Sequence, residues 1–357
     1  MMTRAPAVNR IPADFIRPFS DSLALSLTRA FLASADGMMS VASPAERLRH
    51  DPVALDIVTK SQVTIPTLPG TPAVAATQVH VLGALLGTDS MLPAVLPNAT
   101  VAPFGQAASM FVPGYSRDGS AVGFSKAGSP FAPVQRDLSL GYTLTAGRRC
   151  GFISVFTREA MFSELFVRRQ ITGDIGAGID TLMLSTNAAD DATGTPAGLR
   201  NTVNAIGATA GGGEAAMTAD LSAIGAAVAK VGGGNVLYVA SPKEFIKIRA
   251  RLPLFKLPLV ASSGLADGVI LCMAPVALAI SSADRPLRIE VSDQAVLHMD
   301  TSPTALTTAG TPPASAFPER SMFQTDCKAL KLVADDLDWG WRTIAGNCIA
   351  WVTGVTW

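Results

Sequence analysis

The pattern of apolar and polar residues is clearest at the C-terminal end of the chain. Two runs rich in branched and aromatic residues, 329–333 and 349–357, flank an acidic turn. This pattern predicts two strands joined by a loop. All four tryptophans of the protein fall in this stretch, at Trp339, Trp341, Trp351 and Trp357. So aromatic an ending predicts that the C-terminus is tied into a core.

Earlier in the chain, residues 104–140 predict a long hairpin. Residues 109–113 form its first strand, 114–130 are rich in glycine and serine, and 131–144 alternate as the return strand. The preceding residues, 1–103, predict an arm. After one amphipathic helix at 21–33 the arm is dense in proline, which prevents long helices and favours extended chain on a surface.

A long helix is predicted after a short strand at 152–156. Thr157 is a candidate helix cap, and apolar residues at helical spacing continue the helix over 157–185. Gly173, Gly176 and Gly178 interrupt the helix. Each costs up to about 1 kcal/mol relative to alanine, so the helix is expected to be bendable.

Residues 201–317 predict an α/β-like region. Thr218 is the expected cap of a helix that stops at the glycines 232–234, and 236–240 reads as a buried strand. Ser241, Pro242 and Glu244 form a capping box that starts a second helix. Three more strands are expected, at 269–273, 276–280 and 287–291.

Composition narrows the class of protein. Only 16% of the 357 residues are charged and 48% are hydrophobic, which excludes disorder over most of the length. So few charges suit a chain that buries part of its surface against neighbouring subunits. The formal net charge is zero, which argues against a strongly basic face that grips nucleic acid.

The residues that usually carry chemistry are scattered. Cys150, Cys272, Cys327 and Cys348 form no Cys-x-x-Cys pair and are expected to be free, buried thiols in a reducing compartment. The three histidines are isolated, and no phosphate-binding loop is present. The sequence therefore predicts no catalytic, cofactor or metal site. The longest apolar run, 269–280, contains Pro275 and is too short to span a bilayer.

Pairs of like charges have ordinary structural explanations. The carboxylates at 190–191 and 335–336 are expected in solvated turns. The arginines at 148–149 and 168–169 are expected to make salt bridges between subunits, with contact to nucleic acid as the less favoured alternative.

Three motifs resemble the major capsid proteins of tailed bacteriophages, the Hong-Kong-97-type fold family. They are Phe-Gln-Thr-Asp at 323–326 with Asp-Trp-x-x-Arg at 338–342, Ala-Trp-Val-Thr-Gly-Val-Thr-Trp at 350–357, and Gly-Thr-Pro-x-Gly-Leu at 194–199. A hairpin before a long helix is similar to that family too. The resemblance covers about residues 100–357.

What the resemblance implies is an α+β phage capsid fold in four parts. These are an N-terminal arm (1–103), an extended loop (104–140), a peripheral domain (141–200 and 318–346) with spine helix 157–185, and an axial domain (201–317 and 347–357). Gly173, Gly176 and Gly178 would be flex points of that helix. Lys126, at the loop tip, is a candidate for an intersubunit crosslink or contact. Its alternative is an exposed loop lysine.

The implied function is a structural subunit without enzymatic activity or cofactor. It would self-assemble as hexamers and pentamers into an icosahedral shell around double-stranded DNA, bound without sequence specificity. Implied partners are a scaffolding protein, a portal and a decoration protein, with no membrane. The location would be the virion, assembled in the host bacterial cytoplasm. Two alternatives stay open: an encapsulin-type nanocompartment, and a soluble α/β enzyme formed by 201–317.

Overall fold

The computed structural model describes most of the chain from residue 82 onward. The described residues are 82–83, 85–86, 90–105, 107–115, 141–159, 164–283, 287–300 and 319–357, with the backbone of 307–308 and 314–315. Helices and several separate sheets alternate along them, so the expected α+β class is confirmed. Lys126 and most of the predicted arm and hairpin tip lie outside the described residues. None of the described helices is both long and apolar enough to cross a membrane.

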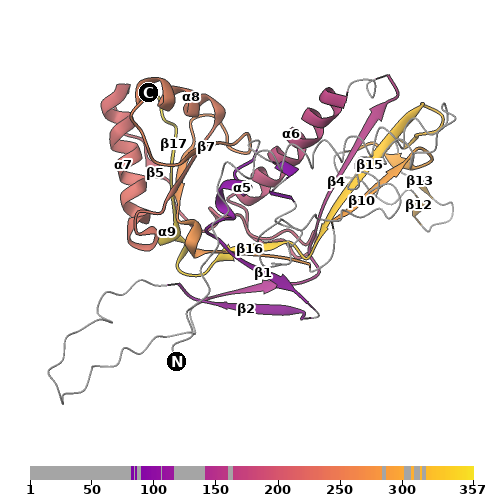
Figure 1. Ribbon diagram of the computed structural model, residues 1–357, viewed down its shortest axis with the longest axis horizontal. Coiled ribbons are helices and arrows are strands. Elements are labelled where there is room, and N and C mark those ends of the chain that lie inside the picture. The colour runs from indigo at the N-terminus through magenta and orange to yellow at the C-terminus, as the bar shows by residue number, and fades with distance from the viewer. Residues whose placement is uncertain are drawn as a thin grey trace, which may run out of the picture.

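One end of the molecule is an α/β body built on a five-stranded sheet (Figure 1). Its strands, in spatial order, are β5 (Ile206–Gly207), β17 (Ile349–Thr353), β8 (Ile270–Met273), β6 (Leu237–Ala240) and β7 (Leu259–Ala261). Helix α7 (Gly213–Gly232) packs against β17 and β8, and α8 (Pro242–Arg251) packs against β6 and β7. A short helix, α9 (Ala345–Cys348), leads into β17.

The ends of α7 and α8 can be compared with the helix ends that the sequence predicts. Gly233 ends α7 in the left-handed conformation, and Ser241 with Pro242 begins α8, as predicted. The predicted capping box is not formed, because the Ser241 hydroxyl donates to the Glu244 carboxylate and caps no backbone N–H. The cap at Thr218 is wrong, because α7 already begins at Gly213. Glu214 to Met217 extend the helix toward its N-terminus, and the Thr218 hydroxyl donates to the Glu214 carbonyl at 2.9 Å.

The other end is an antiparallel sheet of β10 (Arg288–Ser292), β15 (Cys327–Asp335) and β4 (Arg149–Thr157). Thr157 pairs with Cys327 as the last residue of β4, and 158–159 form a turn, so these residues belong to no helix. The predicted helix 157–185 is therefore too long at both ends, and α6 spans Glu164–Met183. Strand β10, predicted at 287–291 within the axial region, belongs instead to this sheet, because its partner is β15.

A third sheet connects the two ends. Strand β9 (Leu278–Ala283), preceded by the 3-10 turn η3 (Pro275–Ala277), lies between β1 (Thr100–Phe104) and β16 (Asp338–Trp341). The expectation of one loop between two C-terminal strands is wrong. The acidic turn itself contains β16, and its neighbours β15 and β17 lie in different sheets.

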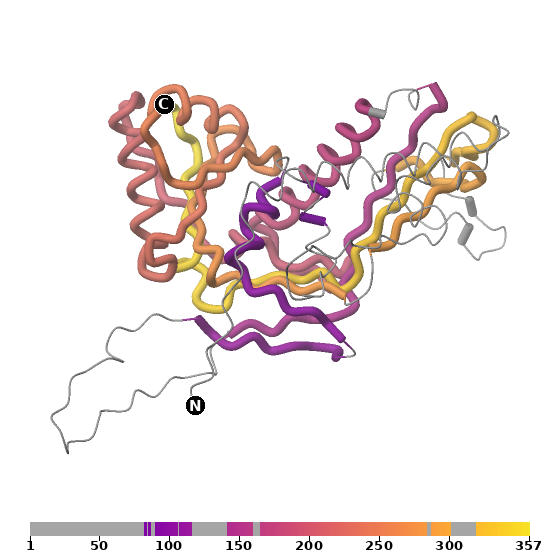
Figure 2. The backbone as a smooth tube through the Cα atoms, in the orientation of Figure 1, coloured from indigo at the N-terminus to yellow at the C-terminus, as the bar shows by residue number. Residues whose placement is uncertain are grey.

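The last described part of the predicted arm is not a surface segment. Ser90 to Phe104 contain α5 (Leu92–Val95) and β1, and Leu92 and Val95 are buried in the main core. Figure 2 shows this indigo segment running through the middle of the molecule beside α6. Extended arm is therefore the wrong description for these residues.

The hairpin is confirmed at its base. Strand β2 (Ser109–Pro113) pairs antiparallel with β3 (Gly141–Thr145), in register from Ser109 opposite Thr145 to Pro113 opposite Gly141. Among the described residues there are also two small strand pairs, β11 (Val296–His298) with β14 (Glu319–Ser321) and β12 (Thr307–Thr308) with β13 (Ala314–Ser315).

Candidate functional site

Strand β16 and the arginine that follows it hold together segments that are far apart in sequence. Successive side chains of a strand point to opposite faces. Asp338, Gly340 and Arg342 accordingly contact the hairpin side, whereas Trp339 and Trp341 reach the segment after α6. We call residues 338–342 the β16 clamp.

Asp338 fixes the return strand of the hairpin. Its carboxylate is fully buried, accepts the backbone N–H of Thr145 at 2.8 Å and pairs with Arg148 Nη1 at 2.8 Å. The Arg148 side chain is itself only 14% exposed. Burial raises the pKa of the Asp338 carboxyl, while Thr145 and Arg148 oppose the rise. Asp338 and Arg148 thus form a buried ion pair at the end of β3.

Arg342 fixes the outgoing strand. Its Nε donates to the Pro113 carbonyl at 2.9 Å, and its Nη1 donates to Thr100 Oγ1 at 2.8 Å. The guanidinium also lies over the Tyr115 ring, 5.7 Å from the centroid. The clamp therefore holds the last residues of β2 as well as the end of β3.

Gly340 lets the hairpin approach β16 closely. A Cβ at this position would lie 2.3 Å from the Tyr142 ring on β3. Burial, followed by the charge of Asp338, raises the pKa of Tyr142. Any larger residue at 340 would therefore force the Tyr142 ring to shift.

The two tryptophans of the clamp reach the exit from α6. Trp339 Nε1 donates to the Ala197 carbonyl at 3.0 Å, and Trp341 Nε1 donates to the Leu199 carbonyl at 2.8 Å. Between them, Gly198 approaches the α6 exit so closely that a Cβ would lie 2.0 Å from the Ser185 carbonyl oxygen. The Gly-Thr-Pro-Ala-Gly-Leu stretch therefore joins the clamp to the end of α6.

Gly198→Ala is expected to lower the free energy of unfolding by about 1–3 kcal/mol, because the backbone around Ser185 must shift. Gly346→Ala is the matched control, since a Cβ there meets no atom within 4 Å. Urea unfolding of both variants measures the difference. Equal midpoints for the two variants would contradict the close approach.

The remaining tryptophans confirm that the C-terminus is tied into the core. Trp351 Nε1 donates to the Val203 carbonyl at 3.0 Å, and Trp357 Nε1 donates to the buried Asp220 carboxylate at 2.7 Å. Lys247 Nζ donates to the carbonyl of Trp357 at 2.8 Å. All four indole N–H groups thus end on the stretch between α6 and the middle of α7.

Asp180 in α6 is a second buried carboxylate that sequence reasoning missed. It accepts hydrogen bonds from Ser90 Oγ at 2.6 Å, Met91 N at 3.0 Å and Ser262 Oγ at 2.5 Å. Burial raises its pKa, and these hydrogen bonds oppose the rise. The signal in the sequence was a carboxylate next to Ile179 on the buried stripe of a helix. Asp180 joins α6 to the segment before α5 and to the loop after β7.

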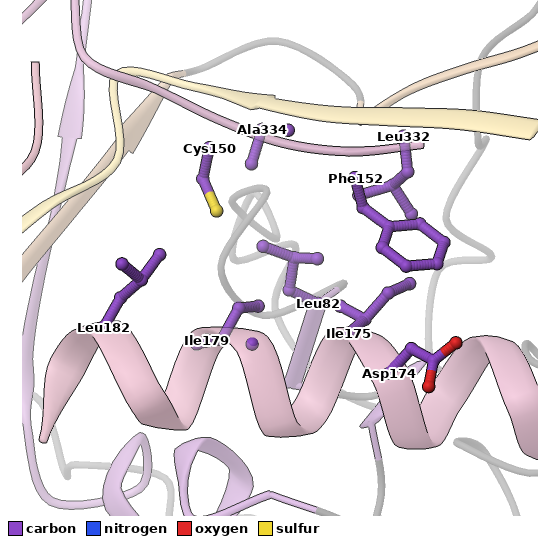
Figure 3. Close-up of a pocket in the computed structure, with 11 residues that line it drawn as sticks. Leu82, Cys150, Phe152, Asp174, Ile175, Ile179, Leu182, Leu332 and Ala334 are labelled. Carbon is purple, nitrogen blue, oxygen red and sulfur yellow. The ribbon is translucent and has the colours of Figure 1, made fainter. Parts of the chain in front are cut away.

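The glycines predicted as flex points all lie inside α6, which is unbroken from Glu164 to Met183. Gly176 is buried, whereas a Cβ at Gly173 or Gly178 would meet no atom within 4 Å. Gly178 faces an apolar gap between α6 and the β4–β15 sheet, into which Cys150, Phe152 and Leu182 also point (Figure 3). Bending at these glycines remains a prediction.

Gly178→Ala is expected to raise the free energy of unfolding by about 0.5–1 kcal/mol, because alanine loses less backbone entropy in a helix and fits here without a clash. The midpoint of urea unfolding should therefore shift to a higher urea concentration. Gly264→Ala serves as the contrast, since its Cβ would lie 2.5 Å from the Asp180 carbonyl carbon. A lower urea midpoint for Gly178→Ala would contradict the prediction, because it would mean that other atoms already occupy the space of the added methyl group.

Of the paired charges, Arg148 and Arg149 make ion pairs inside the chain, with Asp338 and Asp335, where pairs between subunits were expected. Asp335 is only 6% exposed and pairs with Arg288 at 3.0 Å and Arg149 at 3.4 Å, so its assignment to a solvated turn is wrong. The β15 ladder carries it into the sheet. Asp190 does lie in an exposed turn, where it accepts the Ala192 N–H at 2.9 Å.

The chemistry of the described residues is sparse. All four cysteines are free, and burial raises the pKa of Cys272 and of Cys348 to about 12. Across the described residues, no group of three or more His, Cys, Asp or Glu side chains is placed to hold a metal ion. The role that the geometry of the β16 clamp supports is structural, because the clamp fixes the β2–β3 hairpin to the end of α6.

Comparison with known proteins gives likeness in structure alone. No family model matches the sequence, and no curated protein matches it. Among solved structures, the chain is similar to one from Mycobacterium phage Adephagia (14% identity, TM-score 0.45), covering 73% of this chain and 90% of that one.

Two further solved structures come from shells. A chain from the capsid of an empty GTA particle is 12% identical with a TM-score of 0.43, covering 82% of this chain and 94% of that one. A chain from the satellite phage P4 procapsid is 10% identical with a TM-score of 0.45, covering 87% and 98%. Identities and TM-scores are low in all three cases.

Proposed function

We propose that this chain is a major capsid subunit, which self-assembles into the icosahedral shell around the double-stranded DNA of a tailed phage. The observation that carries the proposal is the β16 clamp. It anchors both ends of the hairpin that encloses residues 116–140, and it ties that hairpin to the end of α6. A hairpin held this firmly at its base can transmit force between subunits.

Apolar side chains on the described surface support assembly. Large ones lie exposed at Ile153, Phe166, Phe323 and Ile344. Single exposed apolar residues are ordinary, but so many on a chain with only 16% charged residues favour burial against other copies. Contacts with identical subunits would cover them.

The finer parts of the proposal follow from the resemblance in sequence. Hexamers and pentamers would form with a scaffolding protein and a portal, and a decoration protein would be a further partner. Assembly would take place in the host bacterial cytoplasm, and packaged DNA would be held without sequence specificity. Lys126 would contact or crosslink a neighbour, and α6 would act as the spine helix of the peripheral domain, bending at Gly173, Gly176 and Gly178 during expansion.

The two alternatives are less favoured. An encapsulin-type shell shares the assembly chemistry but holds cargo enzymes in place of a genome. An α/β enzyme built on 201–317 would need convergent reactive groups. The buried carboxylates of this region, Asp220 and Glu244, are engaged in holding the C-terminus and the start of α8. We therefore expect no enzymatic activity.

Negative-stain electron microscopy of the purified protein, with an absorbance ratio for nucleic acid, tests the proposal. Closed angular shells, tubes or capsomer rings are expected. DNA inside shells purified from phage-infected cells would separate the phage shell from the encapsulin alternative. A monodisperse monomer or dimer over a range of salt and protein concentration would overturn the proposal.

A further inference from the structure

A basic and apolar surface lies on α8 and the loop that follows it. We call it the α8 surface, and it consists of Lys243, Ile246, Arg249, Arg251, Leu254 and Lys256. Ile246 is 66% exposed and Leu254 is 84% exposed, among the highest values for large apolar side chains in the described chain. The surface lies at the outer end of the α/β body, beside the C-terminus (Figure 1).

This segment carries a net positive charge, although the chain as a whole is neutral. Residues 242–258 contain five lysines and arginines and one carboxylate, Glu244. Glu244 is buried and bonded to Ser241, so it presents no charge to the outside. Lys247 is occupied by Glu244 and by the carbonyl of Trp357. Lys243 pairs with the exposed Asp267 at 3.6 Å. The remaining cations, Arg249, Arg251 and Lys256, border the exposed apolar side chains.

The helix and the loop form one surface because Arg249 joins them. Its guanidinium lies 5.5 Å from the centroid of the Phe245 ring, and its Nη1 donates to the Phe255 carbonyl at 3.4 Å. Phe255 in turn packs edge-on against Tyr238 of β6, with centroids 5.2 Å apart. Ile246, one helical turn before Arg249, and Leu254, next to Phe255, therefore border the same surface.

We propose that the α8 surface docks an acidic, amphipathic segment of a second protein. Carboxylates of that segment would pair with Arg251 and Lys256, and its apolar side chains would cover Ile246 and Leu254. A phosphate backbone would satisfy the cations but leave both apolar side chains exposed. A second copy meeting this surface across a two-fold axis would bring the same cations together, which disfavours that contact.

The binding itself does not depend on the role of the chain. Naming the partner as an assembly protein rests on the proposed function: for a shell subunit, it would be a separate scaffolding protein with acidic, apolar helices. Such contacts between exposed charges are weakened by salt. A partner held this way can leave when the shell is complete.

A synthetic helical peptide with glutamate and leucine at helical spacing is the probe, followed by fluorescence anisotropy with the full-length, unassembled protein. The charge-reversal variant is Arg251→Glu with Lys256→Glu, and the apolar variant is Ile246→Ser with Leu254→Ser. Lys230→Glu, an exposed cation near the end of α7, is the matched control. Circular dichroism checks that each variant is folded.

Each double variant is expected to weaken peptide binding by about tenfold or more, and the Lys230 control to leave it unchanged. Peptide binding should also fall with added salt. Equal binding by all variants would overturn the proposal. So would tighter binding of short double-stranded DNA that is insensitive to the serine variant, or self-association abolished by the charge reversal.

The two proposals fail separately. Shells without peptide binding would overturn only the α8 inference. Peptide binding by a protein that stays monomeric at every salt and protein concentration would overturn only the shell role.

Discussion

Asp338→Ala is expected to lower the free energy of unfolding by about 3–5 kcal/mol and to abolish shell assembly. The loss of stability follows because the substitution leaves Arg148 charged, 14% exposed and without its buried partner. The Thr145 N–H would lose its acceptor as well. Urea unfolding measures the first effect, and electron microscopy measures the second.

The control is a salt bridge on the surface. Glu290→Gln removes the partner of Lys331, where both side chains are nearly half exposed and 3.1 Å apart. Its cost should stay within about 0.5 kcal/mol, because solvent screens exposed pairs. If Asp338→Ala cost no more than Glu290→Gln, the buried pair would not hold the hairpin. Asp338→Ala shells of normal form would show that assembly does not need the clamp.

Local signals in the sequence were sufficient for the elements whose ends are set by neighbouring residues. Gly233 needs a left-handed conformation, and Pro242 suits the first position of a helix, so both helix ends were predicted. Strand β2 was predicted because alternation and a glycine-rich turn lie within a few residues of each other. Strand β6 was recognised because a short, continuous apolar run follows the glycines that end α7.

Long-range pairing accounts for what the sequence did not reveal. Thr157 has the character of a helix cap, but pairing with Cys327 keeps it in β4. Strand β16 is short and partly polar, and it becomes a strand because β9 offers an open edge. The Asp338–Arg148 pair spans 190 positions, so no pattern along the chain could indicate it. The motif that resembled capsid proteins nevertheless lies on this strand.

Asp180→Ala is expected to lower the free energy of unfolding by about 3 kcal/mol. Three buried donors, from Ser90, Met91 and Ser262, would lose a charged acceptor at once. Gly264 packs against the same turn of α6, so the loop after β7 has no room to rearrange around the loss. Asp174→Ala, an exposed position on the same helix, is the control and should cost little.

Asp180→Asn distinguishes lost shape from lost charge, because asparagine keeps the size and one acceptor oxygen. Burial raises the pKa of Asp180 in the folded protein, so the folded state binds its proton more readily than the unfolded state does. The contribution of Asp180 to stability must then fall as pH rises from about 4, the unfolded value, through the raised folded value. Below that window the protonated carboxyl carries no desolvation cost.

The quantity to measure is the difference in urea unfolding free energy between wild type and Asp180→Asn from pH 4 to neutrality. We expect the unfolding free energy of wild type to fall relative to that of Asp180→Asn as pH rises, because only wild type must bury a charge. Other titrating groups cancel in the difference. A difference that stays flat, or that grows in favour of wild type with pH, would mean that the hydrogen bonds from Ser90, Met91 and Ser262 outweigh burial.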